Sequence, residues 1–204
     1  CIDVTRKFPD IAEKLKSDIP VEEKLRLLPP PGINRAMIPE LLRNLSADQL
    51  KVMTEAPPQV GGMFPNMLFA FVFIPQPDAE PIGLTLVHAY VPRGPDKLEF
   101  VNWVLAEKDT PEDIKKTISM MSTQMFGTSG MVEQDDSDTW PHMTLAAKGA
   151  MGRKITMKYQ ALHSGGKPEG WPGPGIVYDG FTKDDTQWHW WLYWLELMTS
   201  NAAD

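Results

Sequence analysis

The sequence contains almost no cysteine and no long apolar run. Of its 204 residues only Cys1 is a cysteine, so no disulfide can form within the chain, as is typical of a reducing cytoplasm. The longest apolar stretch, Met67–Pro75, is about half as long as a membrane helix requires. The first fifteen residues are mixed and charged, unlike a secretory signal. We therefore expect a cytoplasmic protein with no membrane contact.

Basic residues are also too few and too scattered to favour nucleic acid as a partner. The chain has 20 Lys and Arg against 27 Asp and Glu, a net charge of −7, and no Lys or Arg run. It has no glycine-rich nucleotide-binding motif and no G-x-S-x-G nucleophile motif. None of its four histidines lies at metal-ligand spacing from another, so each alone is read as a structural or surface residue: His88, His142, His163 and His189.

What remains is an ordinary globular composition, 42% hydrophobic and 23% charged, sufficient for one substantial core. The first residue is not Met, so we expect the chain to be part of a longer polypeptide. Residues 1–55 have a helical pattern. Pro20–Leu28 reads as a short helix with Pro at its start, and Ser46–Gln49 has the spacing of a capping box that opens a helix to about Thr54.

The middle of the chain changes to β-branched and aromatic runs separated by Pro, Gly and Asp, which predicts antiparallel strands at Met67–Ile74, Ile82–Val91 and Leu98–Leu105. A helix is then predicted from Thr110 as its cap to Phe126 at its end. Its apolar residues recur at helical spacing, which makes one stripe: Ile114, Ile118, Met121 and Met125.

A further helix is expected to follow the acidic residues after Phe126 and to run to about Gly149, with Pro141 in its first turn. Ile155–Tyr159 is predicted as a short strand, and residues 163–175 as a Gly/Pro-rich loop. The last helix, Asp185–Thr199, holds four of the seven tryptophans and is apolar around most of its circumference. Such a helix has to be enclosed, so we expect it to pack across the concave face of the sheet.

These elements predict the α+β class, with an antiparallel sheet wrapped around a long C-terminal helix in a helix-grip arrangement. We expect residues 1–204 to form a single partial catalytic domain. Residues 1–55 would be its helical lead-in, and residues 56–200 would be its core of sheet and helix.

The most unusual local feature is an acidic segment, Glu133–Asp138, with four carboxylates within six residues. Carboxylates this close repel one another unless a divalent cation or solvent neutralises them. One interpretation is a metal site, and the other is a solvated helix start favoured by the helix dipole. The segment lacks the Gly and the terminal Glu of a calcium-binding EF-hand loop. The residues alone leave both interpretations open.

Several motifs, in this order, resemble the catalytic domain of the large (alpha) subunits of Rieske-type aromatic-ring-hydroxylating dioxygenases. Each is weak alone, but the ordered set is specific, and it covers roughly residues 55–200. Pro75–Pro81 forms an extra turn that this family usually lacks. The motifs are Met63–Asn66, Tyr90–Pro95 with Glu99 and Trp103, Thr110–Ile114, Phe126–Asp136 and Trp194–Met198.

The resemblance implies that Asp136 is the carboxylate of a two-His, one-carboxylate Fe(II) site, which leaves open positions for dioxygen. It also implies that Phe126 and Val132 line the substrate pocket, with Val60 and Ala70 in another wall. The family's paired iron-binding histidines and its C-x-H…C-x-x-H segment for a [2Fe–2S] cluster have no counterpart in these 204 residues. The chain would hold one of three iron ligands and be inactive alone.

The implied function is addition of both atoms of dioxygen to an aromatic hydrocarbon or aromatic acid, giving a cis-dihydrodiol. Electrons would come from NAD(P)H through a separate reductase, often with a ferredoxin, and through the [2Fe–2S] cluster. The expected assembly is a homotrimer, or an α3β3 complex with a small beta subunit. Two alternatives stay open: a Rieske monooxygenase or demethylase, and a metal-free helix-grip module that binds a small apolar ligand.

Overall fold

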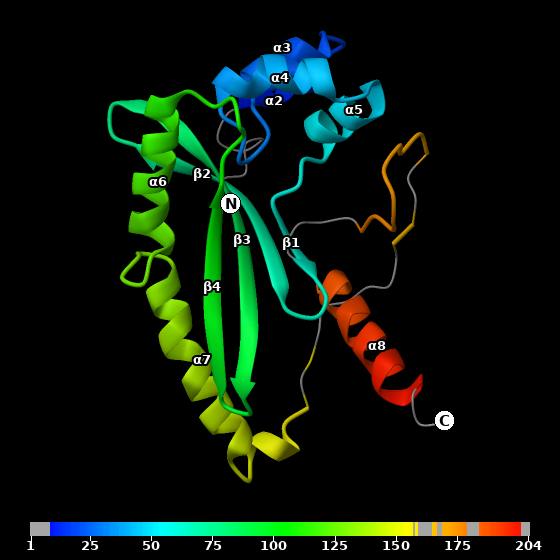
Figure 1. Ribbon diagram of the computed structural model, residues 1–204. Helices are drawn as coiled ribbons and strands as arrows, with labels where there is room; N and C mark the ends of the chain where they lie inside the picture. The colour runs from blue at the N-terminus through cyan, green and yellow to red at the C-terminus, as the bar shows by residue number, and fades with distance from the viewer. Residues whose placement is uncertain (1–8, 157, 159–164, 167–168, 179–183, 201–204) are drawn as a thin grey trace. The chain divides into compact units, whose positions relative to one another are not determined.

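A computed structural model describes residues 9–156, 158, 165–166, 169–178 and 184–200. The chain divides into two compact units, residues 1–144 and residues 145–204. The first unit contains a four-stranded antiparallel sheet with helices, and the second contains a long C-terminal helix (Figure 1). The predicted α+β class is therefore confirmed.

The sheet has the strand order β1-β2-β3-β4. Its strands β2, β3 and β4 are the three that the sequence predicts. Strand β1 was missed, because its sequence Val-Gly-Gly-Met has two glycines and no alternation of apolar and polar side chains. The strand bounds are Val60–Met63 for β1, Met67–Gln76 for β2, Ala79–Gly94 for β3 and Lys97–Leu105 for β4.

The expected extra turn at Pro75–Pro81 is smaller than its sequence suggests. Strands β2 and β3 pair as far as Gln76 and Ala79, so that Pro75 and Pro81 lie within the strands. Only two residues remain at the tip of the hairpin, of which Asp78 has a φ of 56°. The pairing register shifts between Ile74 and Gln76, an irregularity that accommodates the proline between them.

The hydrophobic core lies between the sheet and helix α6, Glu112–Phe126. Successive side chains of a strand point to opposite faces, so the even-numbered residues of β2 and β3 share the face that α6 covers. The predicted apolar stripe of this helix packs there, and burying each aliphatic side chain contributes about 1.5–3 kcal/mol. The buried core residues are Ala70, Ile74, Ile82, Leu84, Leu86 and Ile118, and Ile114, Met121, Met125 and Phe126 pack against them.

Two details of the helix starts differ from prediction. Pro111, not Thr110, is the N-cap of α6, because the Thr110 hydroxyl donates instead to the Glu107 carboxylate at 3.1 Å. Helix α7, Glu133–Lys148, begins at the acidic residues themselves. Pro141 therefore lies in its interior rather than in its first turn, and it cannot donate the helical hydrogen bond to the Ser137 carbonyl.

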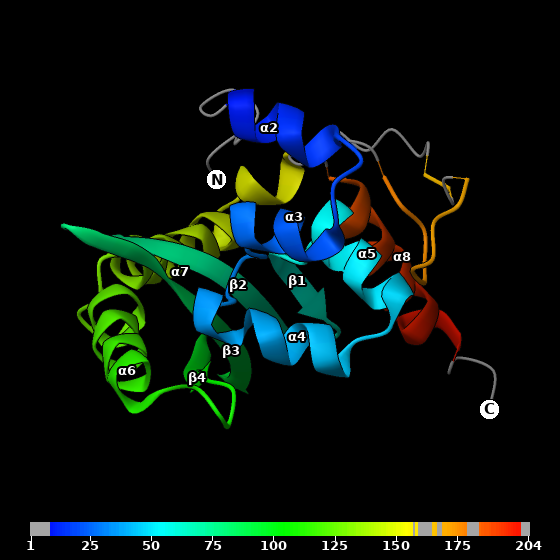
Figure 2. The same ribbon diagram turned by 90° about the horizontal axis from the view of Figure 1, so that it is seen from above.

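Short helices form the lead-in at one end of the sheet (Figure 2). The predicted capping box is confirmed: the Gln49 N–H donates to Ser46 Oγ at 3.3 Å, and the Ser46 N–H donates to Gln49 Oε1 at 2.9 Å. The helices are α2 at Pro9–Lys16, α3 at Val21–Leu27, the 3-10 turn η1 at Arg35–Met37, α4 at Ile38–Asn44 and α5 at Ala47–Glu55.

The lead-in is joined to strand β3 through one asparagine. Asn34 Nδ2 donates to the Gly83 carbonyl at 3.2 Å, and the Gly83 N–H donates to Asn34 Oδ1 at 2.8 Å. Strand β4 pairs with β3 only from Thr85 onward, so the Asn34 amide satisfies the edge that β4 leaves open. The approach requires glycine, because a Cβ on Gly83 would lie 2.7 Å from the backbone of Gly32.

The second unit contains little strand structure among its described residues. Its one strand pairing is an isolated antiparallel bridge between Gly166 and Val177. Of the strand predicted at Ile155–Tyr159, residues 155, 156 and 158 lie outside any strand, and positions 157 and 159 lie outside the described residues. No partner strand for this segment exists in the described chain.

The predicted C-terminal helix is confirmed as α8, Asp185–Ser200. Seven large side chains of α8 are exposed within the second unit, and the enclosure of this helix against the sheet stays a prediction. None of the described helices has both the length and the apolar character needed to span a membrane. The exposed side chains are Trp191, Leu192, Tyr193, Trp194, Leu195, Leu197 and Met198.

Candidate functional site

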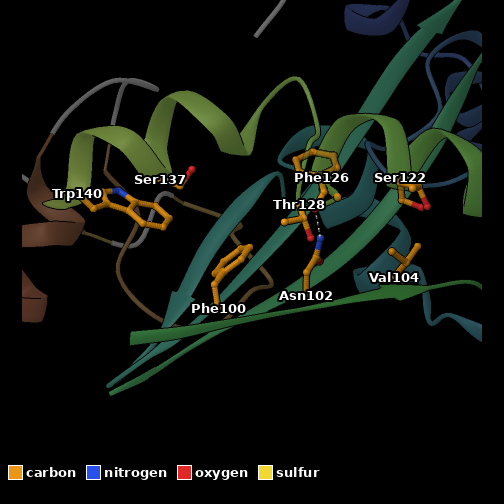
Figure 3. A pocket seen from close by; sticks show the side chains of 10 residues that line it. Phe100, Asn102, Val104, Ser122, Phe126, Thr128, Ser137 and Trp140 are labelled. Carbon is orange, nitrogen blue, oxygen red and sulfur yellow. Dashed lines mark hydrogen bonds between the residues drawn. The ribbon is translucent and has the colours of Figure 1, made fainter. Parts of the chain in front are cut away.

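A hollow of about 530 Å³ lies between strand β4 and the two helices α6 and α7, within the first unit (Figure 3). Its volume is within the range of pockets that hold small organic ligands. Three elements and one turn supply its lining: Phe100, Asn102 and Val104 from β4, Ser122, Thr123 and Phe126 from α6, Gly127 and Thr128 from the turn, and Ser137 and Trp140 from α7.

The turn between α6 and α7 is held by consecutive backbone hydrogen bonds. The Gly130 N–H donates to the Gly127 carbonyl at 2.7 Å. The N–H groups of Met131 and Val132 each donate, at 3.0 Å, to a carbonyl in the last turn of α6. The turn therefore fixes the start of α7 relative to the end of α6, where Phe126 lies.

Aromatic side chains form one wall of the hollow. Phe100 stacks on His88 with ring centroids 5.2 Å apart, and Phe126 meets the same histidine edge-on at 6.0 Å. Tyr90 contacts Phe100 at 5.2 Å and Trp140 at 5.7 Å. Such pairs contribute about 0.5–1.5 kcal/mol each beyond burial, so they stabilise the arrangement of this wall.

His88 is the titratable member of this cluster, and it is only 3% exposed. Burial lowers the pKa of its imidazole below the usual value of 6.5, because desolvation disfavours the charged form. The ring is therefore neutral at physiological pH and gives the hollow no positive charge.

Asn102 joins the sheet to the end of α6. Its Nδ2 donates to the backbone carbonyl of Phe126 at 3.1 Å, the bond drawn as a dashed line in Figure 3. This bond fixes the orientation of the amide, because a flipped amide would set two acceptor oxygens against each other. The other amide atom, Asn102 Oδ1, is buried and has no hydrogen-bond partner in the described structure.

Three of the four hydroxyl groups of the lining already use their protons. Ser122, Thr123 and Ser137 each donate to a backbone carbonyl in the preceding turn of their own helix, at 2.9 Å for Thr123 and 3.0 Å for Ser137. A hydroxyl has one proton, so towards any ligand these oxygens act only as acceptors. None of the ten lining residues is Lys, Arg, His, Asp or Glu.

Of the four predicted pocket residues, only Phe126 lines the hollow. Phe126 lines the hollow and packs against the core cluster that contains Ala70. Val60 pairs with Ala70 across β1 and β2, but its side chain is 62% exposed and does not line the hollow. Val132 is 39% exposed and is likewise outside the lining.

Sequence reasoning missed Asn102, which donates a hydrogen bond to the Phe126 carbonyl and lines the hollow. The available signal was a lone amide on the face of β4 that is otherwise apolar, with Leu98, Phe100 and Val104. Trp140 also lines the hollow and was not predicted as a pocket residue.

Asp136 lies on α7, next to Ser137 and one turn before Trp140, and its side chain is exposed. Among the described residues, no three His, Cys, Asp or Glu side chains lie close enough together to hold a metal ion. A carboxylate is a suitable iron ligand, but a single one does not form an iron site. The Glu133 side chain, Cys1 and His163 lie outside the described part of the structure.

No protein-family model matches the sequence. The alpha subunit of N,N-dimethyl phenylurea N-demethylase from Sphingobium sp. is 23% identical over 158 residues, covering 76% of this chain and 34% of that protein. The alpha subunit of benzene 1,2-dioxygenase from Pseudomonas putida is 24% identical over 122 residues, covering 60% of this chain and 27% of that protein. This chain therefore spans about a third of the length of the curated relatives it matches.

A solved structure of naphthalene 1,2-dioxygenase from Rhodococcus sp., bound to indole, superposes with a TM-score of 0.74 at 27% identity. The match covers 86% of this chain and 41% of that chain. Sequence and structure thus point to the same group of proteins.

Proposed function

We propose a function from the premise that this chain belongs to the alpha-subunit family of Rieske-type aromatic-ring-hydroxylating dioxygenases. In the intact protein it forms the substrate-binding part of an oxygenase that adds both atoms of dioxygen to an aromatic ring, giving a cis-dihydrodiol. The observation that carries the proposal is the aromatic-walled hollow, which joins Phe126 to the helix bearing Asp136.

Asp136 is proposed as the carboxylate ligand of a mononuclear Fe(II), which supplies dioxygen activation when bound. The two histidine ligands and the [2Fe–2S] cluster would come from outside these residues. This chain's own part is to orient the ring between Phe100, Phe126 and Trp140 and to exclude water. Further walls at Val60, Ala70 and Val132 are proposed from the resemblance to the family.

The partners follow from the family as proposals. Electrons from NAD(P)H would reach the protein through a separate reductase, with or without a ferredoxin. The assembly would be a homotrimer or an α3β3 complex with a beta subunit, in the cytoplasm.

The proposal is tested by removing the proposed ligand in the intact protein. Asp136→Ala is expected to abolish retention of the mononuclear iron and ring oxidation, while the far-ultraviolet circular dichroism stays unchanged. Asp138→Ala is the matched control, because Asp138 is an exposed carboxylate on the same helix and is expected to keep both. Metal analysis of the two purified variants decides between them: normal iron content in Asp136→Ala contradicts the assignment.

A second candidate, oxidative demethylation, is favoured by one specific observation. The Sphingobium relative, which matches 76% of this chain, is a subunit of an N-demethylase. Turnover of an N-methylated arene under labelled dioxygen separates the two reactions, since a dihydrodiol carries both label atoms and a demethylase releases formaldehyde. A metal-free binding module would instead retain arenes with no iron in the purified protein.

A further inference from the structure

Helix α7 packs on the sheet through the indole of Trp140. Of its described side chains, only Trp140 and Thr144 are not exposed. The indole meets the ring of Tyr90 edge-on, with centroids 5.7 Å apart, and lies 6.1 Å from the ring of Phe100 (Figure 3). These contacts are on the sheet side of α7, so they do not depend on what covers its outer face in the intact protein.

The sheet itself holds the two rings that Trp140 contacts. Tyr90 and Phe100 lie directly opposite each other in the pairing of β3 with β4, with centroids 5.2 Å apart. The backbone of Tyr90 is also bonded to the turn between β1 and β2. Its N–H donates to the Asn66 carbonyl at 2.9 Å, and its carbonyl accepts from Asn66 Nδ2 at 3.1 Å. Trp140 therefore contacts a part of the sheet whose position is set independently of α7.

Asp136 and Trp140 lie on neighbouring parts of the helix surface. Each residue of an α-helix advances by about 100°, so four residues place Trp140 about one turn along the helix and about 40° round it from Asp136. Ser137, which lines the hollow, lies about 60° away on the other side of Trp140. The rotation of α7 that packs the indole on Tyr90 and Phe100 therefore also sets the direction of Asp136.

The backbone of α7 supports Asp136 firmly on one side only. Before it, the N–H groups of residues 131 and 132 bond the chain to α6. After it, Pro141 has no N–H to donate to the Ser137 carbonyl, so the helical hydrogen bonds are interrupted one residue beyond Trp140. A helix can bend at such a proline, so the residues that follow hold the preceding turn less firmly. The indole of Trp140 supplies an attachment at that point.

We propose that Trp140 is a positioning residue for Asp136, fixing the direction of its carboxylate through the contacts with Tyr90 and Phe100. The inference rests on the proposed function, because it takes Asp136 as the ligand of the mononuclear Fe(II). A carboxylate that is already held in one direction loses less freedom when it binds a metal than one that has to be ordered on binding. Loss of the indole contact should therefore weaken iron binding although no ligand is removed.

The test measures the affinity for iron in the intact protein without any arene. The mononuclear iron is removed with a chelator, while visible absorbance confirms that the proposed [2Fe–2S] cluster stays in place, and Fe(II) is titrated back without dioxygen. Trp140→Leu is expected to raise the Kd for Fe(II) about tenfold, as expected for a residue that orients a metal ligand. Trp140→Phe, which keeps a ring against Tyr90, is expected to restore most of the affinity.

Variants of Tyr90 separate positioning of Asp136 from contact with a ligand, because Tyr90 contacts Trp140 but does not line the hollow. Tyr90→Leu should raise the Kd for Fe(II) several-fold, whereas Tyr90→Phe, which keeps the ring, should leave it unchanged. The free-energy effects of Trp140→Leu and Tyr90→Leu should add to less than their sum in the double variant, because both remove the same contact.

Trp103→Leu is the matched control. Successive side chains of a strand point to opposite faces, so Trp103 lies on the other face of β4 from Phe100 and does not support α7. Its iron affinity should equal that of the wild type. Hydrogen exchange in the metal-free protein reports the anchoring directly: backbone amides around Asp136 should exchange faster in Trp140→Leu and Tyr90→Leu, but not in Trp103→Leu.

The outcomes separate this inference from the proposed function. If Asp136→Ala keeps its iron, the proposed ligand itself is wrong. If Asp136→Ala loses iron while Trp140→Leu and Tyr90→Leu bind Fe(II) like the wild type, only the positioning role is wrong. An equal rise of the Kd in Trp103→Leu would also overturn that role, because the effect would then be one of general stability. Should Trp140→Leu fail to fold, a wild-type Kd in Tyr90→Leu is enough to overturn it.

Discussion

Two asparagines, Asn34 and Asn102, each connect a strand of the sheet to a distant part of the chain, yet they leave their amides in different states. Asn34 uses both its amide oxygen and its amide nitrogen on the backbone of Gly83. Asn102 uses only its nitrogen, on the Phe126 carbonyl, and its buried oxygen has no partner in the described residues. The amide of Asn34 is therefore fully satisfied, whereas that of Asn102 leaves one buried oxygen unpaired beside the hollow.

The surroundings of the two residues agree with this difference. Beside Asn34, the backbones of Gly32 and Gly83 approach so closely that no side chain fits between them, and Leu25 and Ile38 are fully buried in the lead-in. Beside Asn102 lies a hollow of about 530 Å³. The surroundings of Asn34 are closely packed, whereas those of Asn102 retain space.

The largest expected effect on the free energy of unfolding is that of replacing Asn34. Asn34→Ala should lower the free energy of unfolding by about 2–4 kcal/mol, because it leaves both the N–H and the carbonyl of Gly83 buried without their partner. Urea denaturation followed by circular dichroism measures the change. Asn44→Ala is the control, since Asn44 bonds only an exposed carboxylate and should shift stability by no more than about 0.5 kcal/mol. Equal losses of stability in the two variants would contradict the structural role assigned to Asn34.

Asn102 should matter less for stability than Asn34. Asn102→Leu should change the free energy of unfolding by about 1 kcal/mol or less, because the lost bond to Phe126 is offset by removal of an unsatisfied buried oxygen. The same denaturation experiment checks it. A loss as large as that of Asn34→Ala would mean that Asn102 is a structural residue like its counterpart.

The smallest expected effect is a pH dependence from His88, behind the aromatic wall. Its pKa is lowered by burial in the folded protein, so the unfolded chain binds the proton more readily. Stability should therefore be complete above a pH of about 6.5, fall as the pH drops below that value, and level off below the folded pKa. Comparing the pH profiles of the unfolding midpoint for wild type and His88→Phe checks this, and the same slope in both proteins would contradict it.

Much of the fold could be predicted from local patterns. The three apolar runs became β2, β3 and β4, and the stripe on α6 faces the core, because side-chain periodicity directly reflects burial. Strand β1 escaped detection because pairing with β2, rather than any propensity of its two glycines, makes it a strand. Pro141 was misplaced because the acidic residues proved to be the first turn of α7 itself.

The candidate site was less predictable, because it depends on contacts between distant residues. The bond from Asn102 to Phe126 joins positions 24 residues apart, and that from Asn34 to Gly83 joins positions 49 apart. No local pattern reports such contacts. Phe126 was identified through the family resemblance, whereas the places of Val60 and Val132 depend on side-chain directions that the sequence does not encode locally.

The hydrogen-bonded turn between α6 and α7 fixes the number of residues that can separate Phe126 from Asp136. The backbone of Met131 and Val132 is tied to the last turn of α6, so the turn has no slack to absorb another residue. One residue added at the start of α7 would rotate the remainder of that helix by about 100°, carrying the Asp136 carboxylate to another face. The tip of the β2–β3 hairpin carries no such constraint. Length variation among relatives should therefore be common at that tip and absent between the pocket aromatic and the acidic residue.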